Sequence, residues 1–394
     1  MIPTAALGDI VSIKGGGTPS KSKPEFWNGD IPWVSPKDMK SWEINGAEEK
    51  ITEAAIVGSA TNIVPSGSIL IVNRSGILKH TLPVGIARLP VAINQDIKAL
   101  ICASDVHPEY VAHLVKAAEP VVLKWVRATT ADNFPIENIR ELQIPLPSLV
   151  EQKRIASILD DSVDVRRSRE RSLELLDELK QSLFMQMFGD ADHNHHSFPL
   201  VSIGSIIADG PSNGIYKPSS AYGRGVPILR INNFYDGEVT DLESLRRLEV
   251  DAHELDRFEL KENDIVINRV NSREYVGKSA IVPCLKEKIV YESNMMRFSI
   301  IEEKASAHYV INALQTNSIK SQIRSKIKEA INQASINQSD VKCLEIPLPP
   351  LDEQRRLEKT LECLRSIRVV EKANVDRSEA LAASLRQRAF DGRL

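Results

Sequence analysis

The stretch LQIPLPSLVEQKR at residues 142–154 returns as LEIPLPPLDEQRR at residues 344–356, with nine of thirteen positions identical at a shift of 202 residues. The same shift carries Val165 onto Ile367, Leu183 onto Leu385 and Phe188 onto Phe390. Self-similarity at a fixed shift is typical of a duplicated architecture. The sequence therefore predicts a tandem repeat.

Each quoted stretch predicts the start of a long helix. The IPLP segment must be extended, because proline lacks an N–H group and restricts the residue before it. Residues 148–188 and 351–390 contain neither proline nor glycine. Apolar residues recur there three and four apart, which indicates a helical seam: Ile155, Ile158, Leu159, Val165, Leu173, Leu176, Leu179, Leu183 and Met187 in the first copy, and Leu357, Leu361, Leu364, Ile367, Val370, Leu381 and Leu385 in the second.

A long helix needs a partner to cover its apolar seam, and the natural partner is the other copy. Because a globular segment separates the two helices, we expect an antiparallel coiled coil. The polar residues Arg169, Ser172 and Asn374 interrupt the seam and are candidates for fixing its register. The alternative is two independent surface helices.

The remaining segments predict two mixed domains, since strand-like runs at 68–72 and 264–267 stand beside helix-like stretches at 110–126 and 307–328. The predicted fold class is α+β: two mixed α/β domains separated and joined by two long helices forming an antiparallel coiled coil, with a pseudo-twofold internal repeat. The predicted boundaries are 1–147, 148–190, 191–349 and 350–394. Only short runs align between the two domains, namely 31–34 with 226–229 and 70–74 with 265–269.

The composition limits the classes of protein to which the chain can belong. The chain has 394 residues, 42% hydrophobic and 26% charged, which is typical of a soluble protein of several domains. No apolar run is long enough to span a bilayer and the first residues do not resemble a secretory signal, so we expect a cytoplasmic protein. Four scattered cysteines indicate neither a disulfide framework nor a zinc site. The net charge of −3 excludes a uniformly basic DNA binder, but not one with local basic faces.

Further motifs resemble a known family, the specificity subunits of type I restriction-modification enzymes, over essentially the whole chain. They are GGGTPS at 15–20, FWNGDIPWVSPKDM at 26–39, the two PLPxLxEQ[KR]R segments, and SLRQRAFDGRL at 384–394. The second domain departs from the pattern, because it has the sequences DGPSNGIYKPS and VPILRIN in place of the GTPS and PWVS motifs. This departure leaves the target of that domain open.

The resemblance implies a protein without catalytic residues of its own. Target-recognition domains 1–147 and 191–349 would each read one half of a split double-stranded DNA sequence, with half-sites about one helical turn apart. The helices would dock two methyltransferase subunits that modify an adenine in each half-site, and restriction motor-nuclease subunits join that core. This chain would bind no cofactor and no metal; S-adenosylmethionine is expected on the methyltransferase, and ATP and Mg on the restriction partner.

Candidate DNA-contacting residues carry the paired donors and acceptors that base reading needs. In the first domain they follow a strand-like run: Asn73, Arg74, Ser75, Lys79, His80 and Thr81. The second domain has Asn268, Arg269, Asn271, Ser272 and Arg273 at the corresponding place, with Arg230, Asn232 and Asn233 nearby in sequence. A basic stretch adds candidates for phosphates, Lys320, Arg324, Lys326 and Lys328, followed by Asn332, Gln333, Asn337 and Gln338. The alternative for any one of these is an ordinary solvated loop or helix face.

Other motifs favour structural roles. The histidines at 193, 195 and 196 lie in a polar linker, the glycines of GGGT lack a phosphate-loop pattern, and Trp33 and Trp42 are expected in cores. Neither a glycine-rich cofactor loop nor a [DNS]PP[YFW] motif occurs. Three alternatives stay open. The first is a nuclease or methyltransferase, for which Glu259 and Lys261 are the one candidate catalytic pair. The others are a coiled-coil scaffold that binds protein and a related two-part restriction system.

Overall fold

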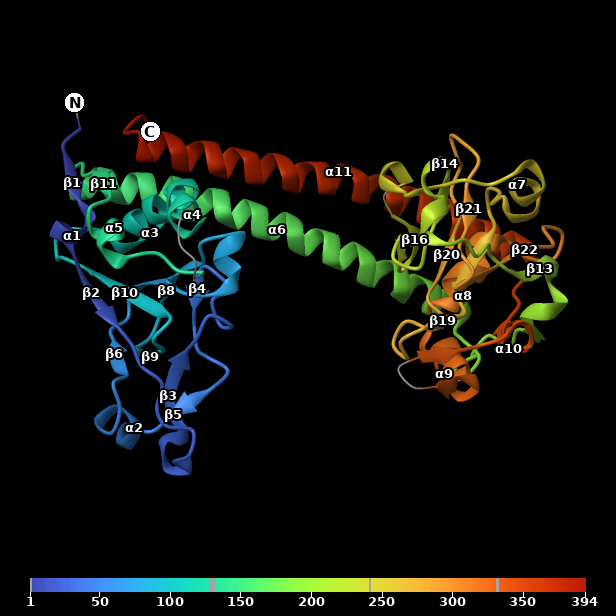
Figure 1. Cartoon of the computed structure of the whole chain (residues 1–394), viewed down its shortest axis with the longest axis horizontal. Helices are drawn as coiled ribbons and strands as arrows, with labels where there is room; N and C mark the ends of the chain where they lie inside the picture. The colour runs from blue at the N-terminus through green and yellow to red at the C-terminus, as the bar shows by residue number, and fades with distance from the viewer. Residues whose placement is uncertain (1, 128–131, 241, 331–332) are drawn as a thin grey trace. The chain divides into compact units, whose positions relative to one another are not determined.

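The computed structural model describes residues 2–127, 132–240, 242–330 and 333–394 (Figure 1). The chain divides into two compact units. Unit 1 comprises Met1–Ser172 with Glu371–Leu394, and unit 2 comprises Leu173–Val370. Each unit combines one mixed domain with part of each long helix. Within the described ranges, no helix is long and apolar enough to cross a membrane.

Unit 1 is built on two sheets. The first has the order β2 (Val11–Gly15), β10 (Ile97–Cys102), β7 (Ile69–Val72), β8 (Val84–Ala87) and β4 (Glu43–Ile44). The second has the order β5 (Lys50–Ile51), β3 (Trp27–Val34), β9 (Val91–Ile93) and β6 (Asn62–Val64), and β1 (Thr4–Ala6) pairs with β11 (Gln143–Pro145). The helices are α1 (Leu7–Ile10), α2 (Glu53–Val57), α3 (Pro108–Ala117), α4 (Glu119–Arg127) and α5 (Ile136–Arg140), with 3-10 turns η1 (Pro24–Phe26) and η2 (Gly76–Lys79). Strand β7 is buried along its whole length, as its unbroken run of apolar residues requires.

Unit 2 repeats this plan. Its main sheet has the order β13 (Ile207–Asn213), β22 (Met295–Ile300), β18 (Ile265–Asn268), β20 (Ser279–Ile281), β16 (Gly237–Val239) and β15 (Phe234–Tyr235). Smaller sheets join β17 (Arg247–Leu248), β14 (Tyr222–Leu229) and β21 (Val290–Tyr291); β19 (Val270–Asn271), β24 (Gln333–Ser335) and β23 (Lys328–Ala330); and β12 (Leu200–Ser202) and β25 (Glu345–Pro347). The helices are α7 (Ala252–Phe258), α8 (Ala307–Leu314), α9 (Asn317–Lys326) and α10 (Gln338–Lys342), with 3-10 turns η3 (Ile203–Ser205), η4 (Ser219–Ala221) and η5 (Leu242–Ser244).

The strand pairing confirms the predicted repeat between the two domains. Strand β10 lies between β2 and β7 in unit 1, as β22 lies between β13 and β18 in unit 2. The parallel pair of Trp33 with Ala92 in unit 1 matches the parallel pair of Ile228 with Val290 in unit 2. The segments that align in sequence thus occupy the same places in the two sheets.

The helix-like stretches predicted at 110–126 and 307–328 are helical in the structure, but each is divided into two helices. Pro120, the second residue of α4, lacks a backbone N–H and favours a new helix start there. In unit 2, the Thr316 side chain accepts a hydrogen bond from the Ile319 N–H and caps the start of α9. Lys328, which was expected in the helix, begins strand β23.

The two long helices, α6 (Leu149–Phe188) and α11 (Leu351–Phe390), are present and run antiparallel within each unit (Figure 1). In unit 1, Arg166 and Arg169 of α6 form ion pairs with Glu379 and Glu371 of α11, at 3.7 and 3.3 Å. In unit 2, Arg368 pairs with Asp177 at 3.1 Å. The predicted coiled coil is therefore confirmed within each unit.

The helical seam confirms most of the predicted apolar residues, including Ile155, Leu159 and Leu173, and differs from the prediction at others. Side chains that are at least partly buried recur with alternating spacings of three and four, at 155, 159, 162, 166, 169, 173, 176, 180, 183 and 187 of α6. The predicted members Val165, Leu179, Ile367, Val370 and Leu381 are instead 44–58% exposed. Long arginine and lysine side chains occupy seam positions, because their aliphatic stems can pack while the charged group reaches solvent.

The start of each long helix is tied to its domain by a buried glutamine. The Gln152 side chain, 2% exposed, accepts a hydrogen bond from the His107 N–H and donates one to the Pro147 carbonyl, both at 2.9 Å. Gln354, fully buried, makes the same two bonds at 2.8 Å, with the Ser306 N–H and the Pro349 carbonyl. This clamp gives a structural reason for the repeated glutamine of the PLPxLxEQ segments.

Candidate nucleic-acid interface

In unit 1 the candidate residues follow strand β7, as predicted from sequence. The segment 73–75 lies beside 132–133: the Ser75 N–H donates to the Asp132 carbonyl at 3.0 Å, and Arg74 forms a β-bridge with Asn133. The Asn73 amide donates to the Phe134 carbonyl at 2.6 Å. The Asn73 amide therefore holds the loop in place, and it is the same donor group that would be needed to read a base.

Carboxylates already pair with the cations of this loop. Arg74 is 57% exposed and its Nε lies 2.6 Å from Asp96, while the Lys79 ammonium lies 3.1 Å from Asp132. Exposed pairs of this kind contribute little stability, so a phosphate or base can compete for the cations at low cost. Ser75 caps η2 through its hydroxyl, His80 is exposed, and the Thr81 hydroxyl donates to Glu119 at 3.0 Å.

In unit 2 the structure brings together two clusters that are about sixty residues apart in sequence. Strand β19, which carries Asn271, pairs with β24, and β24 pairs with β23, which begins at Lys328. Asn271 is partly buried and Lys328 is exposed. Ser272 and Arg273, the exposed residues after β19, continue this surface, and Gln333 stands at the start of β24. Of the weaker candidates, Asn332 lies outside the described residues, while Asn337 caps α10 and Gln338 is its first residue.

Helix α9 gives this surface its positive charge. Ile319 and Ile323 are buried against the core, whereas Lys320 and Arg324 are exposed. In the described part of the chain, Lys320, Arg324, Lys326 and Lys328 have no ion-pair partner. Residues 304–328 contain five lysines and arginines and no carboxylate. This uncompensated local charge suits phosphate binding, despite the net negative charge of the chain.

One predicted base contact is corrected by the structure. Asn268 is fully buried in β18, and its amide donates to the Tyr275 carbonyl at 3.2 Å. A base edge cannot reach this side chain, so Asn268 holds the loop in place. Arg269, which follows it, is partly buried and donates to the Ser293 carbonyl at 3.3 Å.

A second loop of unit 2 carries the candidates Arg230, Asn232 and Asn233. The Asn233 side chain accepts a hydrogen bond from the Arg230 N–H at 3.0 Å and so shapes the turn. Arg230 is 32% exposed and pairs with Glu292 at 3.3 Å, whereas Asn232 is exposed. Sequence reasoning missed Lys278, which joins this loop to the one after β19. The available signal was a lysine three residues after Tyr275, in the segment that follows the candidates 271–273.

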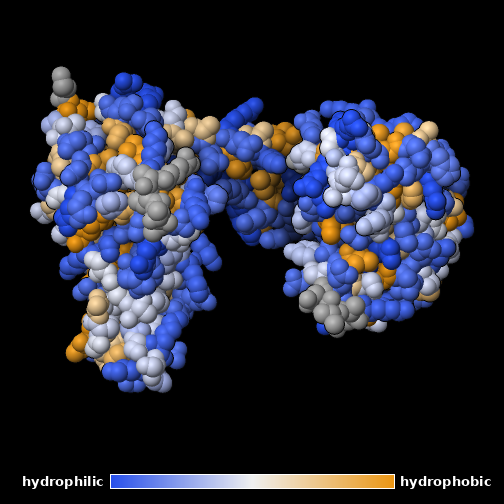
Figure 2. Space-filling view, viewed as in Figure 1, coloured by the Kyte–Doolittle hydropathy of each residue, from blue (hydrophilic) through white to orange (hydrophobic). Residues whose placement is uncertain are grey.

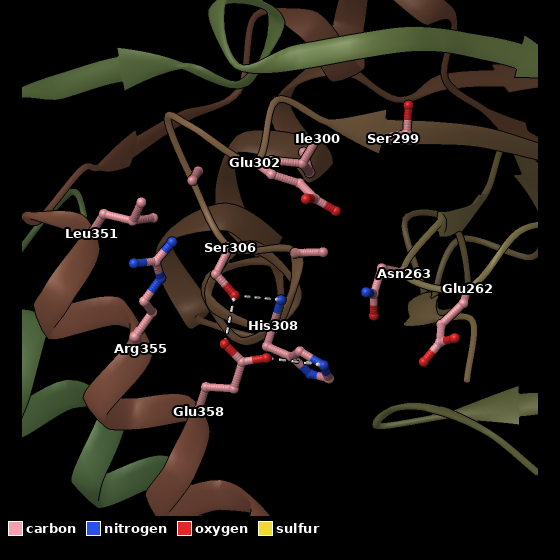
Figure 3. Close-up of a pocket in the computed structure, with 12 residues that line it drawn as sticks. Glu262, Asn263, Ser299, Ile300, Glu302, Ser306, His308, Leu351, Arg355 and Glu358 are labelled. Carbon is pink, nitrogen blue, oxygen red and sulfur yellow. Dashed lines mark hydrogen bonds and ion pairs between the residues drawn. The ribbon is translucent and has the colours of Figure 1, made fainter. Parts of the chain in front are cut away.

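A cavity of about 270 Å³ lies in unit 2 where α8 meets the start of α11 (Figure 3). Ser306, His308, Arg355 and Glu358 line it, and the dashed lines of Figure 3 join Glu358 to both Ser306 and His308. Burial is the main cause that lowers the pKa of His308, although Glu358 acts in the opposite direction. These contacts tie the domain to the start of the long helix.

The residues considered for metal binding, catalysis or phosphate binding have structural roles. Among the described residues, no group of three or more His, Cys, Asp or Glu side chains is placed to hold a metal ion. Glu259 pairs with Lys288 at 3.2 Å, not with Lys261. A Cβ atom on Gly16 would lie 1.9 Å from the Ile93 carbonyl oxygen, so the glycines allow close packing of the backbone. Trp33, 5% exposed, belongs to a core, and Trp42 packs against one.

Comparison with known proteins gives a consistent result. The family model described as the type I restriction modification DNA specificity domain matches residues 4–176 and 216–373. The specificity subunit of the type I restriction enzyme EcoR124I/EcoR124II from Escherichia coli is 38% identical over 181 residues, which cover 45% of each chain. The MjaVIII specificity subunit from Methanocaldococcus jannaschii is 24% identical over 396 residues, covering 95% of this chain and 89% of the relative. The chain thus spans about half the length of the first relative and most of the second.

Two solved structures share the fold. A chain from a study of complex assembly and conformational transition of the type I R-M system superimposes with a TM-score of 0.65 at 18% identity, over 100% of both chains. The S subunit of a type I restriction-modification system from M. genitalium gives a TM-score of 0.53 at 13% identity, covering 98% of this chain and 96% of the other. With both repeats matched by the family model, this chain belongs to the family of type I restriction-modification DNA specificity proteins.

Proposed function

We propose that this chain is the specificity subunit of a type I restriction-modification complex, which reads a bipartite sequence in double-stranded DNA and carries no catalytic site. One observation supports this most directly: five strands of the main sheet follow the same order in the two domains, while the loops after β7 and β18 differ in sequence. A scaffold that repeats and loops that diverge suit one task performed on two different half-sites. The cations of α9 and of both loops supply the phosphate and base donors.

The long helices provide a surface for partner subunits. In unit 2, α6 exposes Leu175 and Leu179 by 48% and 49%, and α11 exposes Ile367, Val369 and Val370 by 44%, 66% and 58%. Figure 2 shows hydrophobic residues at the surface along these helices. Exposed apolar side chains that cluster on paired helices are typical of a protein–protein contact. In unit 1, Val165 and Leu381 are exposed on the same two helices.

The proposed partners follow from the duplication. One methyltransferase subunit would dock on each repeat, giving two, and restriction motor-nuclease subunits would join that core. S-adenosylmethionine would bind to the methyltransferase, and ATP and Mg to the restriction subunit.

A genome-wide map of methylated adenines tests the proposal. Cells would express the chain with its cognate methyltransferase, and control cells the methyltransferase alone. We expect a split motif that appears only when the chain is present. A stable complex that produces no new methylation would contradict the proposal and favour the protein-binding scaffold.

A further inference from the structure

Lys278 lies between the two predicted DNA-reading loops of unit 2. Its ammonium donates to the Ile231 carbonyl at 2.7 Å, in the loop that follows β14. The same ammonium lies 4.9 Å from the ring centre of Phe234, 3.9 Å from that of Tyr235 and 5.4 Å from that of Tyr275. We call Lys278 and these three aromatic residues the Lys278 cage. It joins segments about forty residues apart in sequence.

The Lys278 ammonium forms no ion pair in the described part of the chain. Burial is the main cause that lowers its pKa, and Asp236 acts in the opposite direction. An ammonium has three donors, and the Ile231 carbonyl accepts from one of them. The aromatic faces offset part of the cost of removing the cation from water. An oxygen acceptor from outside the chain would complete its surroundings.

The two tyrosines of the cage are exposed to solvent. Tyr235 is 46% exposed and Tyr275 is 45% exposed, although both rings are large and apolar. The Tyr275 carbonyl is held by the buried Asn268 amide, and the Gly277 N–H donates to the Asn268 carbonyl at 2.9 Å. The loop that carries Tyr275 and Lys278 is therefore fixed before any ligand binds, which lowers the entropy cost of binding.

The neighbours of the cage in the chain are the predicted base-reading residues. Asn232 precedes Phe234 by two positions, and Ser272 and Arg273 precede Tyr275. The alignment of 70–74 with 265–269 corresponds to a shift of 195 residues. At this shift, the residue of unit 1 that corresponds to Lys278 is Pro83. The cage is therefore specific to the second domain.

We propose that the Lys278 cage is a DNA-contact site of unit 2, in which the Lys278 ammonium binds an oxygen acceptor of the duplex while Tyr235 and Tyr275 pack against the adjoining sugar or base. The inference rests on the proposed function. The acceptor is either a phosphate oxygen or the O6 and N7 edge of guanine, since both accept from a lysine ammonium.

The variant Lys278→Gln tests the contact, because glutamine keeps a donor for the Ile231 carbonyl and removes the charge. Binding to a duplex with the mapped motif is measured by fluorescence anisotropy over a range of salt concentrations, with the full chain bound to its methyltransferase. We expect a loss of affinity of about tenfold or more. The matched control is Lys286→Gln, which removes the same charge from a side chain that is 94% exposed in the same unit, and it should leave the affinity within about twofold.

The form of the loss identifies the acceptor. A phosphate contact predicts a similar loss on every duplex, with the slope of log affinity against log salt reduced by about one. A guanine contact predicts that discrimination relaxes at one base pair of the half-site read by unit 2. In both cases methylation should keep its requirement for the other half-site.

The tyrosines provide an independent test. Tyr235→Phe keeps the aromatic face and should bind as the wild type does, whereas Tyr235→Leu removes the cation–π contact and should lose affinity. Urea unfolding of each variant shows that it is folded; should Lys278→Gln not fold, Tyr235→Leu and Tyr275→Leu decide the question. Folded variants that bind and discriminate like Lys286→Gln would overturn the inference and leave the proposed function intact. A wild-type complex without sequence-specific binding would overturn the proposed function itself.

Discussion

Gln152 and Gln354 illustrate how single side chains hold a domain to a helix. Each amide group satisfies one backbone N–H of the domain and one carbonyl that precedes its helix. Both side chains are nearly or fully buried, so water cannot replace these bonds. A short repeated motif is thus explained by the hydrogen-bonding needs of the backbone.

Removing the glutamine clamp should destabilise the protein. We expect Gln152→Ala to lower the free energy of unfolding by about 2 kcal/mol, because it leaves the His107 N–H and the Pro147 carbonyl buried without partners. Urea unfolding measures the effect. Gln143→Ala is the matched control, since that side chain is exposed and makes one long hydrogen bond of 3.4 Å, and it should change the value by less than about 0.5 kcal/mol. Equal effects of the two variants would contradict the clamp.

His113 should make stability depend on pH. Its fully buried ring stacks on Trp42 and its Nε2 lies 2.7 Å from Asp160. Burial is the main cause that lowers its pKa, Asp160 and Glu109 raise it, and Arg386 lowers it further. Because the unfolded chain binds the proton more readily, stability is fully present above about pH 6.5 and is lost as the pH falls below it, by up to about 1.4 kcal/mol per pH unit.

The free energy of unfolding between pH 8 and pH 5 tests this expectation. His113→Asn should flatten the dependence in part, leaving the contribution of His308, whose pKa is lowered in the same direction. His80→Asn changes an exposed ring and should leave the profile unchanged. A His113→Asn profile that matches the wild type would show that the ring does not control the acid sensitivity.

At the scale of elements, the long helices pair through charge as well as apolar packing. In unit 1, Arg166 and Arg169 occupy consecutive seam positions and face glutamates of the other helix. The apolar residues next to these positions, such as Val165, point outward instead. The polar seam fixes which residues face each other, while the exposed apolar side chains remain available to partners.

The ion pair of Arg169 and Glu371 can be tested by exchanging its charges. Glu371→Lys places two cations together and should lower the free energy of unfolding by about 1 kcal/mol. The double variant Arg169→Glu with Glu371→Lys restores an opposite pair and should recover most of the loss. A double variant as unstable as the sum of the single changes would show that the pair contributes no coupling energy.

The exposed apolar side chains of the helices should be needed for assembly and not for folding. Val369→Asp combined with Val370→Asp should leave the free energy of unfolding within about 1 kcal/mol of the wild type, since both side chains are exposed. Co-purification with the methyltransferase should fall at least tenfold. Lys359→Asp, an exposed change elsewhere on α11, is the control. Undiminished assembly of the double variant would place the docking surface elsewhere.

At the scale of the whole molecule, the duplication and the proposed function together assign one reader to each half of the target. The two domains repeat the same strand order but differ in the loops that face the proposed DNA. Their functions should therefore be separable.

A domain exchange tests this separation. Replacing residues 1–147 with the first domain of another specificity protein should change one half of the methylated motif and preserve the other half. Sequencing of methylated adenines reads both halves in a single experiment. A change in both halves, or in neither, would contradict two independent readers.

The sequence alone determined the repeat, the two long helices and the family, because these depend on local patterns: proline before a helix, the absence of helix breakers, and motifs at a fixed shift. It also placed the candidate loops after β7 and β18, since polar residues that end an apolar run mark the end of a strand.

Only the tertiary structure decided which residues of those segments face one another. Apolar residues are sparse along α6 and α11, so several sets of seam positions agree with the helical period. Contact with the other helix selects the set of positions that includes Arg166 and Arg169. Strand pairing brought Lys328 close to Asn271, buried Asn268, and placed Lys278 among rings from two loops. Such contacts join residues from about forty to more than two hundred positions apart, and no local pattern in the sequence records them.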